Sequence, residues 1–174
     1  MITTGIGAVE ATELWVARRN GTAARRLLIG KESADMRFVV ANMHSVSFSV
    51  TGRDVYFLSS AWATSDALHV ASVSGGLQRF VAPANSLEIV RAGDYAGCLL
   101  VEQHRYWLAG GSYDWIWLLT PTGREIGPVT DADAADTESR LAEFRSLFAP
   151  DSAKKGKLPR TASPNVRCSS RAIQ

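Results

Sequence analysis

Long apolar runs and cysteine motifs are what this sequence most plainly lacks. No stretch approaches the about 20 consecutive apolar residues of a membrane-spanning helix, so we expect no membrane span. Residues 1–7 have no basic region and no apolar core, so we expect no secretion signal. The compartment is left open: periplasmic if a leader has been removed, cytoplasmic otherwise.

The two cysteines, Cys98 and Cys168, form neither a CxxC pair nor a disulfide scaffold, and Cys98 is expected to be a small buried apolar residue.

Motifs for catalysis, metal binding and nucleotide binding are also missing. The three histidines, His44, His69 and His104, are not spaced as HxxxH or HExxH, so we expect hydrogen-bonded structural histidines. The stretch Gly110–Asp114 does not read GxSxG and no helix signal follows it, so it predicts a hairpin loop. The acidic stretch 131–136 lacks the glycine and glutamate of a calcium loop, and no phosphate-binding glycine motif occurs. We therefore assign no catalytic residue, no metal and no cofactor.

Positive charge is concentrated at the C-terminal end. Residues 151–174 carry six basic side chains against Asp151 alone, although the whole chain has a net charge of only +2. The rest of the chain is therefore acidic. Because residues 151–174 are also rich in serine and proline and hold few large apolar groups, we expect a basic, disordered tail rather than a nucleic-acid-binding segment.

One pattern occurs three times: an apolar strand, a polar turn that contains a glycine, and a second short strand. The copies are Leu14–Gly21, Leu68–Gly75 and Ile116–Gly123. Their starts lie about 50 residues apart, a spacing typical of a propeller blade. Because a single repeat cannot bury its apolar face alone, neighbouring repeats are expected to cover one another.

The pattern predicts antiparallel meanders followed by one helix. Residues 44–82 predict four strands, residues 86–129 predict four more, and residues 13–29 supply only a pair. The segment 30–43 predicts a longer connection with room for an extra strand at Arg37–Val40. A helix is expected over 134–149, because Leu141, Phe144, Leu147 and Phe148 follow a helical spacing, with the stripe packed on the β body. The chain thus divides into a β domain over 1–150 and the tail.

The stretch Val46–Ser60, followed by Ala67–Gly76, resembles the TolB-like, WD40-like β-propeller repeat. Phe48-Ser49 and Gly52-Arg53 match the repeat, whereas Val50-Thr51 replace its usual Pro-Asp. The resemblance implies an all-β, propeller-like stack, but residues 13–129 supply only about two and a half of the typical four to eight blades. Three arrangements follow: a propeller completed by a second copy, a non-closed stack capped by the helix, or a fragment of a longer protein.

Aromatic residues are the best functional signal. Trp15, Trp115 and Trp117 are expected in the core, whereas Trp62 lies in a polar loop. In a propeller this loop and the loop 109–114 occupy the same position in successive blades, so both are expected on one face. The predicted partner-binding residues are Trp62, Ser65, Asp66, Gly111, Ser112, Tyr113 and Asp114. In the alternative, Trp62 folds back over the edge of its blade.

These patterns favour a non-catalytic protein-binding module, in a concrete version a bacterial inhibitor or immunity-type protein that presents loops to a protein partner. Small immunity proteins that neutralise cell-wall amidase toxins look similar in size and in blade-like build. The alternative is an enzyme or ligand-binding propeller completed by homodimerisation, with Asp66, His104, Arg105 and Asp114 at its centre. A third hypothesis is a purely structural module of a larger chain.

Overall fold

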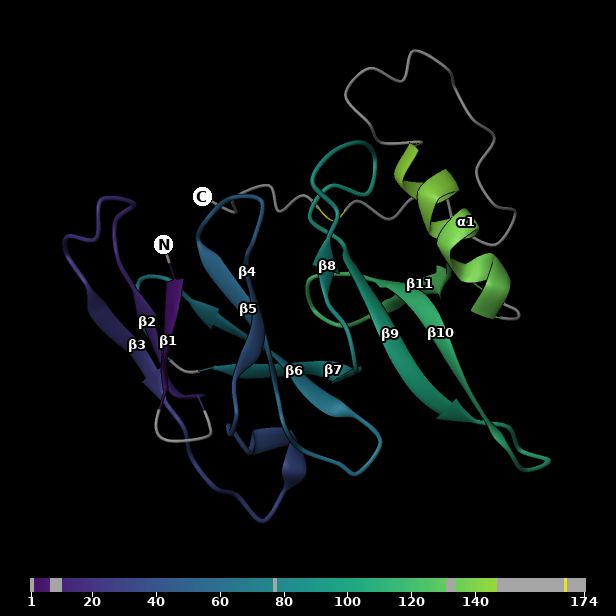
Figure 1. Ribbon diagram of the computed structural model, residues 1–174, viewed down its shortest axis with the longest axis horizontal. Helices are drawn as coiled ribbons and strands as arrows, with labels where there is room; N and C mark the ends of the chain where they lie inside the picture. Colours follow the sequence, from purple (N-terminus) through teal and green to yellow (C-terminus); the bar gives the residue numbers. More distant parts are fainter. Residues whose placement is uncertain (1, 7–10, 77, 131–133, 147–167, 169–174) are drawn as a thin grey trace. The chain divides into compact units, whose positions relative to one another are not determined.

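The computed structural model describes residues 2–6, 11–76, 78–130, 134–146 and 168, and shows a mainly β protein (Figure 1). Within these ranges the strands form three antiparallel sheets, and one α-helix follows the last strand. The all-β class with a C-terminal helix is therefore confirmed. The chain divides into two compact units, Met1–Leu87 and Glu88–Gln174. No helix in the described ranges is long and apolar enough to cross a membrane.

The first sheet of the N-terminal unit has three strands where the sequence predicts two. Its order is β1 (Ile2–Ile6), β2 (Ala11–Val16) and β3 (Arg25–Ile29). β2 is central, and Leu14 pairs with Thr4 on one side and with Leu28 on the other. Leu14 is fully buried. The additional strand β1 therefore protects one edge of the predicted pair from solvent.

The second sheet of this unit is the meander predicted for residues 44–82. Its strands follow in sequence order: β4 (His44–Phe48), β5 (Asp54–Ser59), β6 (Asp66–Ser72) and β7 (Arg79–Ala84). Gly52 has a φ of 69° and donates its N–H to the carbonyl of Ser49, which makes the tight turn between β4 and β5. The apolar strands β5 and β6 are the most buried, as expected for central strands.

The two sheets of the N-terminal unit share one core. Its buried members are Leu14, Val40, Met43, Val55, Phe57 and Ala71. The predicted extra strand at Arg37–Val40 is wrong, because Met36–Phe38 form a short 3-10 helix and Val40 makes only an isolated bridge to Lys31. The cause is local: the Asp35 carboxylate accepts the Arg37 N–H at 3.0 Å, and such side-chain bonds compete with strand pairing.

The C-terminal unit contains the second predicted meander. Its sheet runs β8 (Glu88–Ile89), β9 (Leu99–Tyr106), β10 (Ser112–Leu119) and β11 (Glu125–Pro128). The helix α1 (Ala134–Ser146) begins where the sequence predicts it. The predicted last residues of that helix, 147–149, lie outside the described ranges, as does the predicted tail except for Cys168.

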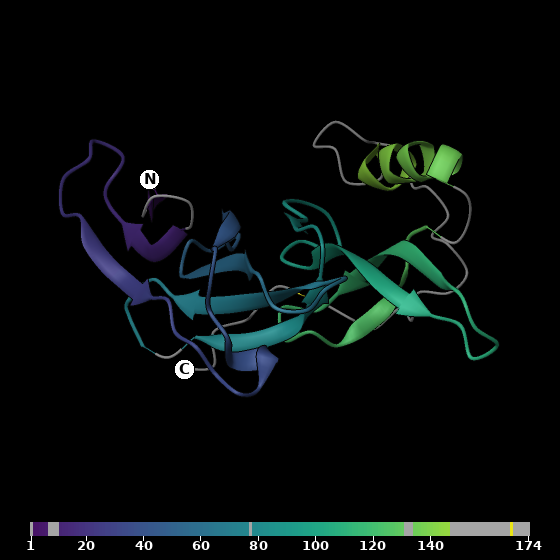
Figure 2. The same ribbon diagram turned by 60° about the horizontal axis from the view of Figure 1, so that its bottom comes forward.

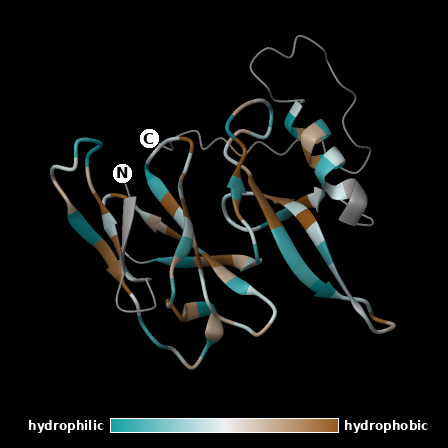
Figure 3. Ribbon diagram, in the orientation of Figure 1, coloured by the Kyte–Doolittle hydropathy of each residue, from teal (hydrophilic) through white to brown (hydrophobic). Residues whose placement is uncertain are grey.

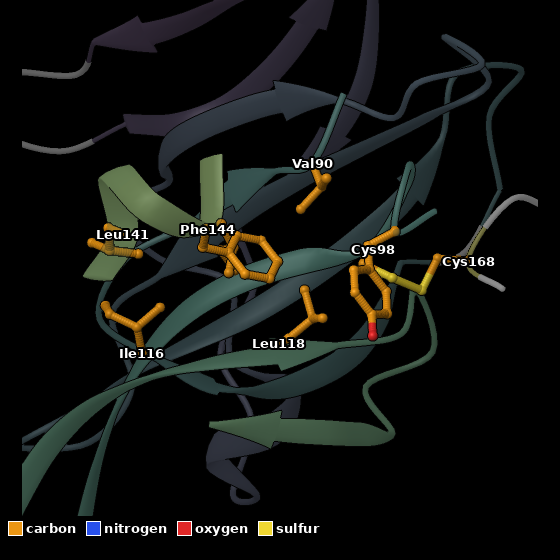
Figure 4. Close-up of a cluster of buried hydrophobic side chains, with 9 residues drawn as sticks. Val90, Cys98, Ile116, Leu118, Leu141, Phe144 and Cys168 are labelled. Atoms are coloured by element: carbon orange, nitrogen blue, oxygen red, sulfur yellow. A yellow bond between two sulfur atoms is a disulfide. The ribbon is translucent and has the colours of Figure 1, made fainter. Parts of the chain in front are cut away.

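The core of the C-terminal unit is formed by the sheet, the helix and a disulfide (Figure 4). Leu141 and Phe144 of α1 are buried in one cluster with Ile116 and Leu118 of β10, so the predicted packing of the helix stripe on the sheet is confirmed. Tyr95 stacks on Phe144 with ring centroids 6.1 Å apart. Leu and Phe side chains each contribute about 1.5–3 kcal/mol when fully buried, so these contacts hold the helix on the sheet.

Cys98 is not the free apolar residue that the sequence predicts. It is bonded to Cys168, 70 residues further along the chain, and both side chains belong to this same core. Such long-range pairing leaves no local signal in the sequence, because neither cysteine has a second cysteine near it.

Candidate protein-binding site

Strands β9 and β10 extend beyond the other strands of their sheet as a two-stranded ribbon (Figures 1 and 2). β8 pairs with β9 only at Leu99 and Leu100, and β11 pairs with β10 only between Trp117 and Leu119. From Gln103 to Trp115, therefore, the two strands pair with each other and with no other described strand. We call residues 103–115 the ribbon.

The turn of the ribbon depends on two glycines. Trp107 donates its N–H to the carbonyl of Gly111 at 3.0 Å, and Gly110 donates to the carbonyl of Trp107 at 3.0 Å. Gly110 and Gly111 have φ values of 94° and 85°, in the left-handed region that glycine adopts without steric cost. The turn is consequently tight, and Leu108 lies within it.

Large apolar side chains are exposed at this end of the ribbon. Tyr106 is 67% exposed, Trp107 47% and Leu108 110%. Figure 3 shows the change in hydropathy, from the hydrophilic outer part of β9 to a hydrophobic stretch at the end of the hairpin. The eight residues from Tyr106 to Tyr113 include no charged side chain. A contiguous exposed apolar surface of this kind is typical of an interaction site.

Aromatic contacts stiffen the ribbon along one face. The ring centroid of Tyr113 lies 4.2 Å from that of Trp107 and 4.5 Å from that of Trp115. Further along, Trp115 and Trp117 are 6.4 Å apart, and the guanidinium of Arg105 lies 3.7 Å above the Trp117 ring. Each such contact contributes about 0.5–1.5 kcal/mol. A two-stranded hairpin is only marginally stable by itself, so these contacts explain how the ribbon keeps its shape.

Charged pairs lie nearer the base of the ribbon. His104 Nδ1 and Asp114 Oδ1 are 2.8 Å apart across the two strands, and the edge of the His104 ring meets Tyr106. On the other face Arg105 donates to Gln103 and to Glu125. The apolar end is thus followed by polar and charged side chains that already have partners, an arrangement like the polar rim around the centre of a protein interface.

The prediction that Trp115 and Trp117 belong to the core is wrong. Both are only partly buried, and they lie on the opposite face of β10 from the core residues Ile116 and Leu118. Trp15 is also partly buried, and its Nε1 donates to Glu13 at 2.8 Å. From Trp115 to Leu119, β10 is apolar on both faces, so the pattern alone does not reveal which face packs against the helix.

The other predicted loop, between β5 and β6, belongs to the N-terminal unit. Trp62 is 37% exposed, its backbone N–H donates to the carbonyl of Ser65, and its ring meets the Phe80 ring edge-on at 6.1 Å. Trp62 therefore lies partly against the sheet, in agreement with the alternative in which its side chain folds back over the edge of the blade. The expectation that this loop and the ribbon emerge on one face stays a prediction.

Asp66, at the end of that loop, takes part in a chain of polar contacts. Its Oδ2 lies 3.0 Å from His44 Nε2, and His44 Nδ1 lies 3.2 Å from Ser45 Oγ. Ser45 has a φ of 49°, uncommon for a residue other than glycine, and it sits where the β4–β5 register shifts between His44 and Ser47. The sequence hides this group, since only the strand register brings His44 to Asp66.

The structure thus places four predicted residues, Gly111 to Asp114, in the ribbon and three, Trp62, Ser65 and Asp66, at the β5–β6 loop. The sequence interpretation missed Tyr106, Trp107 and Leu108, the most exposed part of the ribbon. The signal that could have found them is the uncharged aromatic stretch directly before Gly110-Gly111. The described ranges hold no group of three or more His, Cys, Asp or Glu side chains that could bind a metal ion.

Comparison with known proteins gave no match: no family model, no curated protein and no solved structure is significantly similar to the chain.

Proposed function

We propose that the protein is a non-catalytic protein-binding module that presents the end of the ribbon to a protein partner. The observation that carries this proposal is the exposed group Tyr106, Trp107 and Leu108 at the end of a stiffened hairpin. Trp and Tyr are enriched among the residues that dominate binding energy, because they bury a large area for a small loss of side-chain entropy.

The shape of the ribbon favours an inhibitor or immunity-type role. A hairpin that is narrow, prestiffened and apolar at its end can enter a cleft of another protein without first being ordered, so little binding energy is lost to conformational entropy. The end of the ribbon has no charge, and the Arg105–Glu125 and His104–Asp114 pairs lie behind it. The cleft of the partner is therefore expected to be apolar at its base and polar at its rim.

The propeller-like architecture is part of the same proposal. It is supported by the sequential strand order of the two four-stranded sheets, which is the order within a propeller blade. On this reading β4–β7 and β8–β11 are blades, β1–β3 form an incomplete one, and the ribbon is an extended loop between the two middle strands of its blade.

Site-specific photocrosslinking tests the proposed function. A photoreactive phenylalanine analogue replaces Leu108 in the chain expressed in its native host, and a matched control carries the analogue at Val50, which is 44% exposed in the N-terminal unit. We expect one crosslinked protein with the first variant and none with the second. Trp107→Ala should then weaken binding of that protein by about 30-fold or more, a loss of about 2 kcal/mol. An affinity unchanged by Trp107→Ala would exclude the ribbon as the binding site.

A second candidate function, ester hydrolysis, is supported by the group Ser45, His44 and Asp66. Ser45 Oγ would attack the ester carbonyl and give its proton to His44 Nδ1, while Asp66 orients the ring through Nε2. The alcohol leaves with a proton from His44, and water then releases the acid from Ser45. Of the residues first suggested for the enzyme alternative, this group keeps Asp66. The other three, His104, Arg105 and Asp114, are already paired within the ribbon and with Glu125.

A fluorophosphonate probe separates the two functions. The hydrolase predicts covalent labelling at Ser45, abolished by Ser45→Ala and preserved in Ser47→Ala, which changes a serine of the same strand. Peptide mapping by mass spectrometry locates the label, and an unlabelled Ser45 would remove this candidate. Light scattering at micromolar concentration shows whether the chain forms the homodimer that the enzyme alternative includes.

A further inference from the structure

The C-terminal unit is held together by a covalent bond as well as by its core. Cys98 precedes β9, Cys168 lies far along the chain, and their Cα atoms are 5.1 Å apart. Cys98 is fully buried and Cys168 is 5% exposed. Both belong to the cluster that includes Leu118 and Phe144 (Figure 4).

The backbone next to Cys98 packs closely against the backbone of Cys168. Gly97 has a φ of 90°, and a Cβ atom placed on it would lie 3.1 Å from the carbonyl oxygen of Cys168. Glycine is the residue that accepts both the left-handed conformation and this close approach. Cys168 is therefore packed against the turn before β9, and its contact with the unit does not consist of the sulfur–sulfur bond alone.

Because the core of the C-terminal unit is small, a covalent cross-link adds stability that the core alone does not supply. Among the described residues, the cluster contains nine buried side chains, two of which are the bonded cysteines themselves. Small cores contribute little net stability after conformational entropy is subtracted, and small domains commonly rely on disulfides for the rest. A bond that joins residues 70 positions apart removes much of the freedom of the unfolded chain.

We propose that the Cys98–Cys168 bond is a structural disulfide of the mature protein, and that the protein works in an oxidising compartment. To form the bond, two thiols lose two electrons and two protons. The electrons pass through a mixed disulfide to the disulfide of a thiol–disulfide oxidoreductase, which is reduced to a dithiol. Thiol-reducing systems oppose this reaction in the cytosol, whereas the periplasm and the extracellular space favour it.

The bond also fixes the base of the ribbon. β9 begins at Leu99, directly after Cys98, and continues without interruption into the ribbon. Loss of the bond should therefore loosen the C-terminal unit and leave the N-terminal unit unchanged. This inference does not depend on the proposed function, because it concerns the cross-link and not the partner of the ribbon.

The thiol state in cells provides the first test. Cells of the native host are quenched in acid, and the denatured full chain is treated with a polyethylene glycol maleimide, with and without prior reduction. We expect no added mass before reduction and two adducts after it. Two adducts without prior reduction would overturn the proposal.

Stability of the purified full chain provides the second test. Reduction with a phosphine should lower the Tm by about 10 °C and speed up amide hydrogen exchange within residues 88–130, with no change in residues 44–84. The variant carrying Cys98→Ala and Cys168→Ala serves as the matched control, because its Tm should equal that of the reduced protein and should not respond to the phosphine. An unchanged Tm of the wild-type chain on reduction, or a control that responds equally, contradicts the inference.

Discussion

A buried histidine should make the stability of the N-terminal unit depend on pH. His69 lies at the centre of β6, fully buried, with its ring stacked on Phe57 at 5.3 Å and meeting the Phe80 ring at 6.1 Å. Neither ring nitrogen forms a hydrogen bond of ordinary geometry in the described part of the chain, so the prediction of a hydrogen-bonded structural histidine is wrong here. His44 and His104, which contact Asp66 and Asp114, fulfil that prediction.

The size of this pH effect on the free energy of unfolding follows from the pKa of His69. Burial among aromatic rings lowers the pKa of His69 from its ordinary 6.5 to about 4, although the Val39 carbonyl acts in the opposite direction. The unfolded chain therefore binds a proton at His69 below pH 6.5, whereas the folded chain does not until about pH 4. Each unit of pKa shift is about 1.4 kcal/mol, so the free energy of unfolding should fall by about 3 kcal/mol as the pH drops through this window. Above pH 6.5 this contribution is constant.

Urea denaturation at several pH values between 7.5 and 4 measures the effect. Other groups titrate in the same range, so the useful quantity is the difference between the wild-type chain and His69→Leu. The variant replaces a buried polar ring by an apolar side chain and should lose this part of the pH dependence. If both proteins lose the same stability between pH 6.5 and 4, burial of His69 does not control the acid response.

Three further predictions concern the C-terminal unit. Gly97→Ala should lower the free energy of unfolding of this unit by about 2 kcal/mol in urea denaturation, because alanine strains the left-handed backbone and approaches the Cys168 carbonyl. Gly21→Ala is the control: it has open space around it and should cost only the conformational strain, about 1 kcal/mol. Equal losses would refute the close-approach argument. Phe144→Ala should cost about 3–5 kcal/mol in the same assay, since it removes the ring that fixes α1 on the sheet, and a loss below about 1 kcal/mol would mean that the helix is not anchored there. Arg105→Gln should speed up hydrogen exchange of the ribbon amides by about 5-fold, because the contacts with Trp117 and Glu125 are both lost. Unchanged exchange would show that Arg105 does not stiffen the ribbon.

The two four-stranded sheets could be predicted from sequence because their signals are local. Alternating apolar residues define β4, and glycine turns such as Gly52 and Gly75 mark where each strand must reverse. Consecutive strands joined by short turns pair with each other, so the order of the sheets follows directly. The helix was predictable for the same reason, since Leu141 and Phe144 lie one turn apart on the face that packs against the sheet.

What the sequence concealed depends on contacts between distant residues. The pairing of Cys98 with Cys168, and of His44 with Asp66, is decided by how the chain folds back, which no short window contains. The outer end of the ribbon was missed for a related reason. Whether Trp107 is buried or exposed depends on where β8 and β11 stop pairing, and their short lengths are not visible in the alternation of β9 and β10.

The bond between Cys98 and Cys168 also changes how mechanical load travels through the chain. A force pulling on the C-terminal end reaches Cys168 and passes across the two sulfur atoms into Cys98, then along the backbone toward the N-terminus. Strands β9, β10 and β11 and helix α1 lie outside this shortest covalent path. The hairpin that carries Trp107 and Leu108 is therefore mechanically shielded: tension on the two ends of the chain would stretch the N-terminal unit before it could unravel the ribbon.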